Sequence, residues 1–386
     1  MQLTHKGLAM RLLVDGMVFE VVGHGGNLRI FQEVLPRLCA FNPELEIVIV
    51  TAGRPQQPLP GHERITNLIF PPLERLIRPG RFFLWSLQRP VRAFVQMPWI
   101  GPVSPYIWHS SYYTLPARPQ GPIVTTVLDL LHERYNGLFS RWDDDWFRKQ
   151  KRRCIEHSDA ILCISETTRR DVINVFDVEP KRVYTVPLAP STTFHRLSEE
   201  ERSVTRASKP YFLYVGGRSN YKNFTILLKA YSQWTHRHKI DLLLVGSPLN
   251  PMEAQEIATL QMQSVVNVLS DISDLRLCQL YNEAIAFVYP SLYEGFGIPV
   301  LEAMASGCQV IASHIPSTVE IAGEIPIYFD PARIDSLIAA LDLAMARHFN
   351  RDLRRLEQGV QRSASYTWDR TAQQTLQIYR NLVPLA

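Results

Sequence analysis

The chain has 386 residues, of which 46% are hydrophobic and 20% are charged. This length exceeds one typical hydrophobic core and predicts two domains, and the composition excludes a disordered or fibrous protein. The net charge of +4 is too small to indicate a nucleic-acid partner. The five cysteines are scattered, and no apolar run or secretory signal indicates membrane insertion or export. We therefore expect a cytoplasmic protein.

Short apolar runs alternate with longer segments of helical period along the chain, which is typical of βα units on parallel sheets. A polar stretch at 191–210 separates two halves that both show this alternation, so we expect the domain boundary there. The predicted domains are 1–195 and 205–365. The predicted strands, in chain order, are 11–14, 46–50, 123–127, 160–164, 211–215, 241–245, 286–289 and 309–312.

Between residues 75 and 94, arginines alternate with aromatic residues. This pattern fits a helix packed on the first domain with its arginines in water. It also fits peripheral contact with an anionic surface on the cytoplasmic face of a membrane. We favour the packed helix and keep the membrane contact as the alternative.

The three acids from Asp143 to Asp145 resemble a divalent-metal pattern at first sight. Ser140 precedes them at the spacing of a capping box, and basic residues follow toward 153. This charge order complements a helix dipole, so we predict a capped helix, no metal site and no cofactor. Ser165 is likewise predicted to cap a helix.

The most informative stretch is residues 289–313, YPSLYEGFGIPVLEAMASGCQVIAS. Gly295 and Gly297 permit unusual φ values, and a proline follows at a position that suits a helix start. The stretch therefore predicts strand, glycine loop, helix and strand. The first amides of that helix, near Val300 and Leu301, are expected to be free and to bind phosphate.

Two carboxylates flank this glycine loop. Glu294 precedes the loop and Glu302 lies about one turn inside the helix, so both could face one bound diphosphate. Carboxylates accept paired hydrogen bonds from vicinal hydroxyls, so one acid would bind a sugar and the other a ribose. The alternative for this stretch alone is an ordinary helix N-terminus with dipole-favoured acids.

A second glycine loop, YVGGRSNYKN at 214–223, follows the predicted strand 211–215. Arg218 and Lys222 lie four residues apart behind its two glycines. At the carboxyl end of a strand, these cations would meet a diphosphate and stabilise the charge that develops as it leaves. The alternative is a solvated loop with two surface cations.

The motifs EGFGIPVLEAMASG and GGRSNYKN together resemble the signature of family 4 retaining glycosyltransferases with the GT-B fold. Further segments resemble the family in order: GHGGNLRIFQEVLPRL at 23–38, WHSSYYTLP at 108–116, TVLDLLHERY at 126–135 and CISETTRRDV at 163–172. The resemblance covers nearly the whole chain. It implies two Rossmann-like α/β domains with parallel sheets facing a cleft. A C-terminal helix, 366–386, would cross back to complete the first domain.

The resemblance also implies a role for each site residue. Arg218 and Lys222 would bind the donor diphosphate, Glu302 the ribose hydroxyls, and Glu294 the transferred sugar. The family retains anomeric configuration and generally needs no metal. The remaining donor-binding positions would be Gly25, Gly26, Gly217, Gly295, Phe296, Gly297, Val300 and Leu301.

The chain departs from the family at one point, since Leu128 stands before Asp129 where many relatives carry a His-Asp pair. Asp129 and His132 are therefore the predicted acceptor-side contacts, and a purely structural histidine is the alternative.

We expect transfer of a hexose with retention from a nucleoside diphosphate sugar to a hydroxyl of a glycan or lipid-linked glycan. Resemblance to bacterial mannosyltransferases of polysaccharide and lipopolysaccharide biosynthesis makes GDP-mannose the first choice of donor. The alternatives are a GT-B sugar epimerase or phosphorylase, and a non-catalytic partner that binds a nucleotide sugar.

Overall fold

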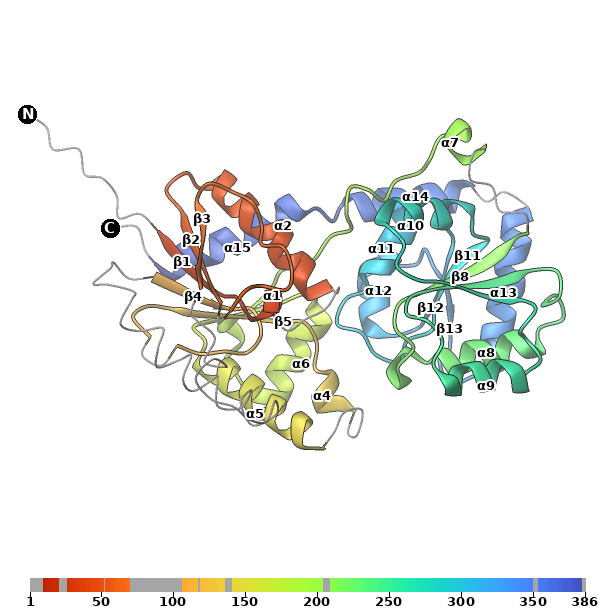
Figure 1. Cartoon of the computed structure of the whole chain (residues 1–386), viewed down its shortest axis with the longest axis horizontal. Coiled ribbons are helices and arrows are strands. Elements are labelled where there is room, and N and C mark those ends of the chain that lie inside the picture. Colours follow the sequence, from red (N-terminus) through yellow and green to blue (C-terminus); the bar gives the residue numbers. More distant parts are fainter. Residues whose placement is uncertain are drawn as a thin grey trace, which may run out of the picture. The chain divides into compact units, whose positions relative to one another are not determined.

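The chain forms two compact units, each built on its own parallel sheet (Figure 1). The computed structural model describes residues 10–20, 26–51, 53–69, 106–116, 119–135, 141–203, 209–349 and 353–383. Unit 1 contains Met1–Pro187 and Trp368–Ala386, and unit 2 contains Leu188–Thr367. The prediction of two Rossmann-like α/β domains is confirmed.

The sheet of unit 1 has the strand order β3-β2-β1-β4-β5-β6-β7 within the described residues. Every neighbouring pair is parallel. The order reverses between β1 and β4, which is where open α/β sheets bind ligands. The strands are β1 Arg11–Asp15, β2 Glu46–Thr51, β3 Ile65–Ile69, β4 Tyr106–Ser110, β5 Ile123–Val127, β6 Ala160–Cys163 and β7 Val183–Thr185.

The last helix returns to unit 1 as predicted. This helix, α15, packs against α2. Arg37 of α2 pairs with Asp369 of α15 at 2.8 Å. The helices of unit 1 are α1 Met17–Glu20, α2 Gly26–Phe41, α4 Leu131–Arg134, α5 Arg141–His157, α6 Glu166–Phe176 and α15 Trp368–Leu382.

A buried histidine joins α15 to the sheet of unit 1. His109 Nδ1 lies 2.5 Å from the Tyr379 hydroxyl, and Nε2 lies 2.8 Å from Thr126 Oγ1. Phe31 of α2 packs edge-on against the imidazole. Burial lowers the pKa of His109 to about 3, so the ring stays neutral at physiological pH.

The predicted starts of two unit 1 helices can be compared with the structure. Ser165 caps α6, because its hydroxyl accepts the Thr168 N–H at 2.9 Å, which confirms that prediction. Helix α5 begins at Arg141, so the acids from Asp143 to Asp145 fall near its start. Ser140, its predicted cap, lies outside the described residues.

The sheet of unit 2 has the order β10-β9-β8-β11-β12-β13 and reverses between β8 and β11. Its strands are β8 Tyr211–Val215, β9 Asp241–Val245, β10 Val266–Leu269, β11 Ala286–Tyr289, β12 Val310–Ser313 and β13 Ile327–Phe329. Its helices are α7 Glu199–Ser203, α8 Phe224–Gln233, α9 Pro251–Thr259, α10 Asp274–Glu283, α11 Ile298–Ala305, α12 Pro316–Ala322, α13 Ile334–Phe349 and α14 Leu353–Ala364.

The two faces of this sheet pack into separate apolar cores, because side chains alternate along each strand. Phe212 and Tyr214 of β8 join a cluster with α8 and α13, whereas Leu213 joins a cluster with α10 and α11. Tyr289, the last residue of β11, lies on the α10 and α11 side.

The chain passes from unit 1 to unit 2 between Pro187 and Leu188, a few residues before the stretch that we assigned as the linker. Phe194 and Leu197 within that stretch are buried in unit 2, where Phe194 packs edge-on against Tyr281. These two apolar anchors fix the start of unit 2 ahead of its first strand.

All eight predicted strands are present, each within one residue of its predicted bounds. No helix in the described part of the chain combines the length and apolarity required to cross a bilayer. The segment 75–94, for which we kept a membrane contact as an alternative, lies outside the described residues.

Candidate active site

The two glycine loops of unit 2 leave neighbouring strands at the point where the strand order reverses. Strands β8 and β11 pair in parallel, with Phe212 opposite Ala286. Past the strand ends, the Leu292 N–H donates to the Tyr221 carbonyl at 2.8 Å and ties the loops together. Two motifs far apart in the sequence therefore meet at one edge of the sheet.

Lys222 and Glu294 form an ion pair at this edge. Lys222 Nζ lies 2.7 Å from Glu294 Oε1, and the two side chains are 21% and 12% exposed. The ammonium also lies over two aromatic rings, 5.1 Å from the centroid of Tyr221 and 5.8 Å from that of Tyr289. The structure thus brings together the cation and the carboxylate that the sequence predicted as neighbours of one ligand.

Two buried tyrosines lie near enough to this ion pair to be affected by its charge. Burial raises the pKa of Tyr214 and of Tyr289, and the negative charge of Glu294 raises both further. The Tyr289 hydroxyl is hydrogen-bonded to the Glu294 carboxylate, and the Tyr214 hydroxyl donates to the Gly217 carbonyl at 2.5 Å. Both phenols therefore stay protonated and act as donors.

Arg218 is directed to the neighbouring β9–α9 loop rather than to Glu294. Its Nη2 donates to the carbonyls of Ser247 and Pro248 at 2.7 and 2.9 Å, and its Nε lies 3.0 Å from Glu253 Oε1. The side chain is only 4% exposed. Within the described residues, Nη1 is buried and has no hydrogen-bond partner. The second predicted cation is therefore held beside the first loop.

Glu253 holds Arg218 and also caps a helix. Its Oε2 accepts the Asn250 N–H at 2.9 Å, while the Asn250 side chain accepts the Glu253 N–H, which forms a capping box at the start of α9. Its other oxygen faces Arg218. Glu253 was not among the predicted site residues, although the Asn-Pro-Met-Glu pattern at 250–253 is a recognisable capping signal.

The loops after β8 and β9 approach closely at two glycines. Gly246 has a φ of +154°, and a Cβ placed there would lie 2.6 Å from the Gly216 carbonyl oxygen. Any side chain at 246 would therefore push the two loops apart. This contact positions the β9–α9 loop against Arg218.

The prediction that the amides of Val300 and Leu301 are free is wrong. Both donate to the Gly297 carbonyl, at 3.0 and 3.4 Å. The reason is that α11 begins at Ile298, one residue before the predicted start, with Gly297 as its N-cap at a φ of +128°. Its first turn is closed onto that carbonyl.

The other predicted donor-binding positions are distributed around this loop and beyond it. Phe296 is buried and packs edge-on against Tyr366. Glu302 is buried in α11, where its charge helps to raise the pKa of Tyr281, whose burial is the larger cause. Gly26 opens α2 in unit 1 and is exposed. Gly25 lies outside the described residues.

The predicted acceptor-side residues lie after β5 in unit 1. Asp129 lies just ahead of the short helix α4, and its Oδ1 accepts the Leu131 N–H at 3.0 Å in an Asx turn. The ring of His132 packs against Phe147 of α5, with 4.3 Å between centroids and a tilt of 38° between the rings. Asp129 therefore already has a structural role in the folded chain.

A buried lysine outside the predicted site residues supports this segment. Lys151 of α5 is 1% exposed, and its Nζ lies 2.9 Å from Glu133 Oε2 and 3.2 Å from the Asp129 carbonyl oxygen. The ammonium also lies over the rings of Phe147 and Tyr113, at 5.2 and 5.4 Å. No spacing in the sequence marks Lys151 as buried.

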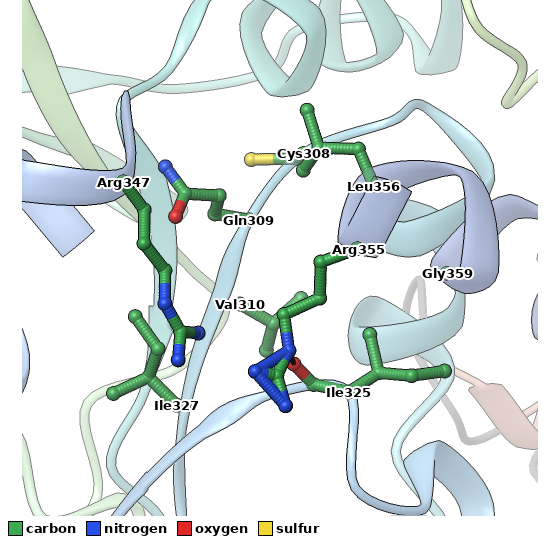
Figure 2. Close-up of a pocket in the computed structure, with 9 residues that line it drawn as sticks. All are labelled: Cys308, Gln309, Val310, Ile325, Ile327, Arg347, Arg355, Leu356 and Gly359. Atoms are coloured by element: carbon green, nitrogen blue, oxygen red, sulfur yellow. Dashed lines mark hydrogen bonds between the residues drawn. The ribbon is translucent and has the colours of Figure 1, made fainter. Parts of the chain in front are cut away.

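Two hollows in unit 2 differ in size and place. One cavity of about 20 Å³ lies at the amino ends of β12 and β13, and Figure 2 shows Arg347, Arg355 and Cys308 around it. It has room for about one water molecule, so it cannot hold a nucleotide. An open hollow of about 380 Å³ lies at the carboxyl ends of β12 and β13. Asn223 donates to the Pro331 carbonyl at its rim, at 2.9 Å.

Comparison with known families covers most of the chain. Residues 33–194 match the family model "Glycosyltransferase Family 4", and residues 196–359 match "Glycosyl transferases group 1". The chain is similar to O-antigen chain mannosyltransferase B of Escherichia coli, with 27% identity over 286 residues, or 72% of this chain and 74% of that protein.

A second relative and a solved structure agree with these matches. The chain is similar to MMP alpha-(1->4)-mannosyltransferase of Mycolicibacterium hassiacum, with 30% identity over 256 residues, or 64% of this chain and 59% of that protein. Its fold is similar to that of sucrose-phosphate synthase from Thermosynechococcus elongatus, with a TM-score of 0.77 and 19% identity over 96% of this chain and 98% of that one.

Proposed function

Because the chain belongs to the family 4 glycosyltransferases of the GT-B type, we propose that it transfers a hexose with retention from a nucleoside diphosphate sugar to a glycan or lipid-linked glycan. GDP-mannose is the proposed donor, since both relatives described above are named mannosyltransferases. The proposed acceptor is a growing polysaccharide on the cytoplasmic side of the membrane.

The observation that supports this proposal most directly is the Lys222–Glu294 pair at the strand reversal of unit 2. An ammonium has three N–H donors, so Lys222 can hold Glu294 and a phosphate oxygen at the same time. Glu294 would in turn accept hydrogen bonds from the hydroxyls of the transferred sugar. One pair would then bridge the two parts of the donor.

In the proposed reaction, the bond between the sugar C1 and the diphosphate oxygen breaks, and the acceptor oxygen bonds to C1 on the same face. A phosphate oxygen takes the acceptor proton. Lys222 stabilises the charge on the leaving diphosphate, so the step requires no metal and no protein nucleophile. Backbone amides of Gly217, Gly295, Phe296 and Gly297 are the proposed further donors.

The remaining residues have proposed roles at a greater distance from C1. Arg218 would favour the diphosphate through its charge, and a direct contact would require it to leave the Ser247 and Pro248 carbonyls. Glu302 would bind the ribose. Asp129 and His132 stay the proposed acceptor contacts.

Replacing Lys222 by Ala tests the proposal. We expect kcat/KM for sugar transfer to fall by at least about 100-fold, as when one donor of an oxyanion site is removed. The exposed Lys229 on α8 provides the matched control, and Lys229→Ala should keep full activity. Turnover that survives Lys222→Ala would contradict the proposal.

A panel of GDP-, UDP-, ADP- and TDP-sugars identifies the donor, because a ligand that binds only the native state raises the melting temperature. The product formed without acceptor, or with inorganic phosphate, separates transfer from epimerisation and phosphorolysis. Binding without any product would indicate the non-catalytic partner.

A further inference from the structure

Tyr289 ends β11 directly behind the Lys222–Glu294 pair. Its side chain is buried, packs against Phe287 with 5.7 Å between ring centroids, and lies close to the α11 N-cap. A Cβ placed on Gly297 would lie 3.9 Å from Tyr289 Cε1, so the ring lies beside the first residue of the α11 turn. A side chain held by packing can hold other groups at low entropic cost.

This tyrosine contacts both members of the pair with different parts of its side chain. The ring face lies 5.8 Å from Lys222 Nζ, within the range of a cation–π interaction. The hydroxyl is hydrogen-bonded to the Glu294 carboxylate. Burial keeps this phenol protonated, so it remains a donor to Glu294 across the working pH range.

We propose that Tyr289 is a positioning residue of the active site, which orients Glu294 through its hydroxyl and Lys222 through its ring. This inference rests on the proposed function. When a donor phosphate attracts the ammonium, Lys222 shares its hydrogen bonds between Glu294 and the phosphate. The Tyr289 hydroxyl then keeps the carboxylate in the orientation that accepts the sugar hydroxyls.

The Tyr289 hydroxyl should affect binding of the sugar part of the donor, and the Tyr289 ring should affect binding of its diphosphate part. Tyr289→Phe keeps the ring and removes the hydroxyl. We expect its affinity for GDP to stay within about twofold of the wild type, and its affinity for GDP-mannose to fall about tenfold, as for a lost hydrogen bond to a charged group. Tyr289→Leu also removes the ring and should weaken both ligands.

Isothermal titration calorimetry with GDP and with GDP-mannose measures this difference, and it does not depend on turnover. Tyr231→Phe is the matched control, because Tyr231 is a buried tyrosine of the same unit whose hydroxyl donates to the Ile240 carbonyl away from both loops. That variant should bind both ligands like the wild type. A melting curve for each variant records any change in the fold.

Equal losses for GDP and GDP-mannose in Tyr289→Phe, or no loss for either, would overturn the inference. If the wild type binds both ligands and Lys222→Ala loses transfer while Tyr289→Phe behaves like the wild type, the proposed function stands and only this inference fails. If the wild type binds neither these ligands nor any other nucleotide sugar, both fail.

Discussion

Two lysine–glutamate pairs occupy the carboxyl edges of the two sheets, and they differ mainly in burial. In unit 2, Lys222 pairs with Glu294 and keeps 21% of its side-chain surface exposed. In unit 1, Lys151 pairs with Glu133 and keeps 1%. Each ammonium also lies over two aromatic rings. The local chemistry is nearly the same, and access to solvent distinguishes them.

This difference separates a pair suited to ligand binding from a pair suited to structure. A partly exposed ion pair can exchange a partner for a phosphate oxygen, because the incoming charge replaces water rather than a packed side chain. A fully buried lysine cannot, and losing its partner leaves an uncompensated charge. The same substitution should therefore mainly lower stability in unit 1 and mainly lower ligand binding in unit 2.

The largest expected effect is on the stability of unit 1. Lys151→Met should lower the free energy of unfolding by about 3–5 kcal/mol, because Glu133 would be left buried without its cation. Lys222→Met, the matched change in unit 2, should cost less than this, because Lys222 is 21% exposed and water can take the place of its ammonium beside Glu294. Urea unfolding followed by circular dichroism measures both.

A double variant tests whether the stranded carboxylate of Glu133 causes this loss of stability. Adding Glu133→Leu to Lys151→Met removes the stranded carboxylate and should restore most of the lost stability, since apolar replacement of a whole buried pair is often neutral. Equal destabilisation by the two lysine variants would mean that solvent access does not distinguish the two ion pairs.

A smaller loss of stability, again in unit 1, is expected when the pH is lowered. His109 is neutral in the native state, with a pKa of about 3, whereas the unfolded chain binds a proton with a pKa near 6.5. Its contribution to stability is therefore complete above pH 6.5 and is lost as the pH falls. Between pH 6.5 and 5 the loss should be about 2 kcal/mol.

The His109→Gln variant isolates this contribution. Its unfolding free energy should decline less over the same pH interval than that of the wild type, measured by urea titrations at pH 7.5, 6.5 and 5.0. Hydrogen exchange should place the difference in α15 and β4, with unit 2 unaffected. Parallel profiles for the two proteins would mean that protonation of His109 does not oppose folding.

The smallest effect is expected at the Arg218 support in unit 2. Glu253→Gln keeps an oxygen for the Asn250 N–H but removes the charge beside Arg218, and should cost about 1 kcal/mol of stability. GDP binding should weaken several-fold, because Arg218 loses its ion pair with Glu253 and is held only by the Ser247 and Pro248 carbonyls. Glu256→Gln, three residues further along α9, is the control and should change neither. A loss of the same size in both variants would exclude a specific role for Glu253.

Most of the strands that could not be predicted from the sequence were missed for the same physical reason. Among the described residues, five strands were not predicted, and four of them, β3, β7, β10 and β13, are the edges of the two sheets. Edge strands bury little surface, so their apolar signal is short or interrupted: β3 has no fully buried position and β13 has three residues. The fifth, β4, is central and fully buried but contains His109 and Ser110.

The residues of the candidate site also differ in whether they could be predicted from the sequence. Lys222 and Glu294 could be predicted because each lies in a short motif whose glycines constrain the loop around it. Two supporting residues, Tyr289 beside that pair and Glu253 beside Arg218, depend on which strands are neighbours and on the direction of a side chain. The free amides at Val300 and Leu301 were predicted wrongly because the helix start was placed one residue late.

The division of unit 1 into two sequence segments has a consequence for how the protein is made on the ribosome. Unit 2 is one continuous segment, Leu188–Thr367, whereas unit 1 needs α15, which is synthesised after all of unit 2. Until α15 emerges, the surface of α2 is not covered by this helix, and His109 lacks its partner Tyr379. While the second unit is translated, the nascent first unit therefore exposes an apolar surface. Chaperones would be most useful at this stage of synthesis.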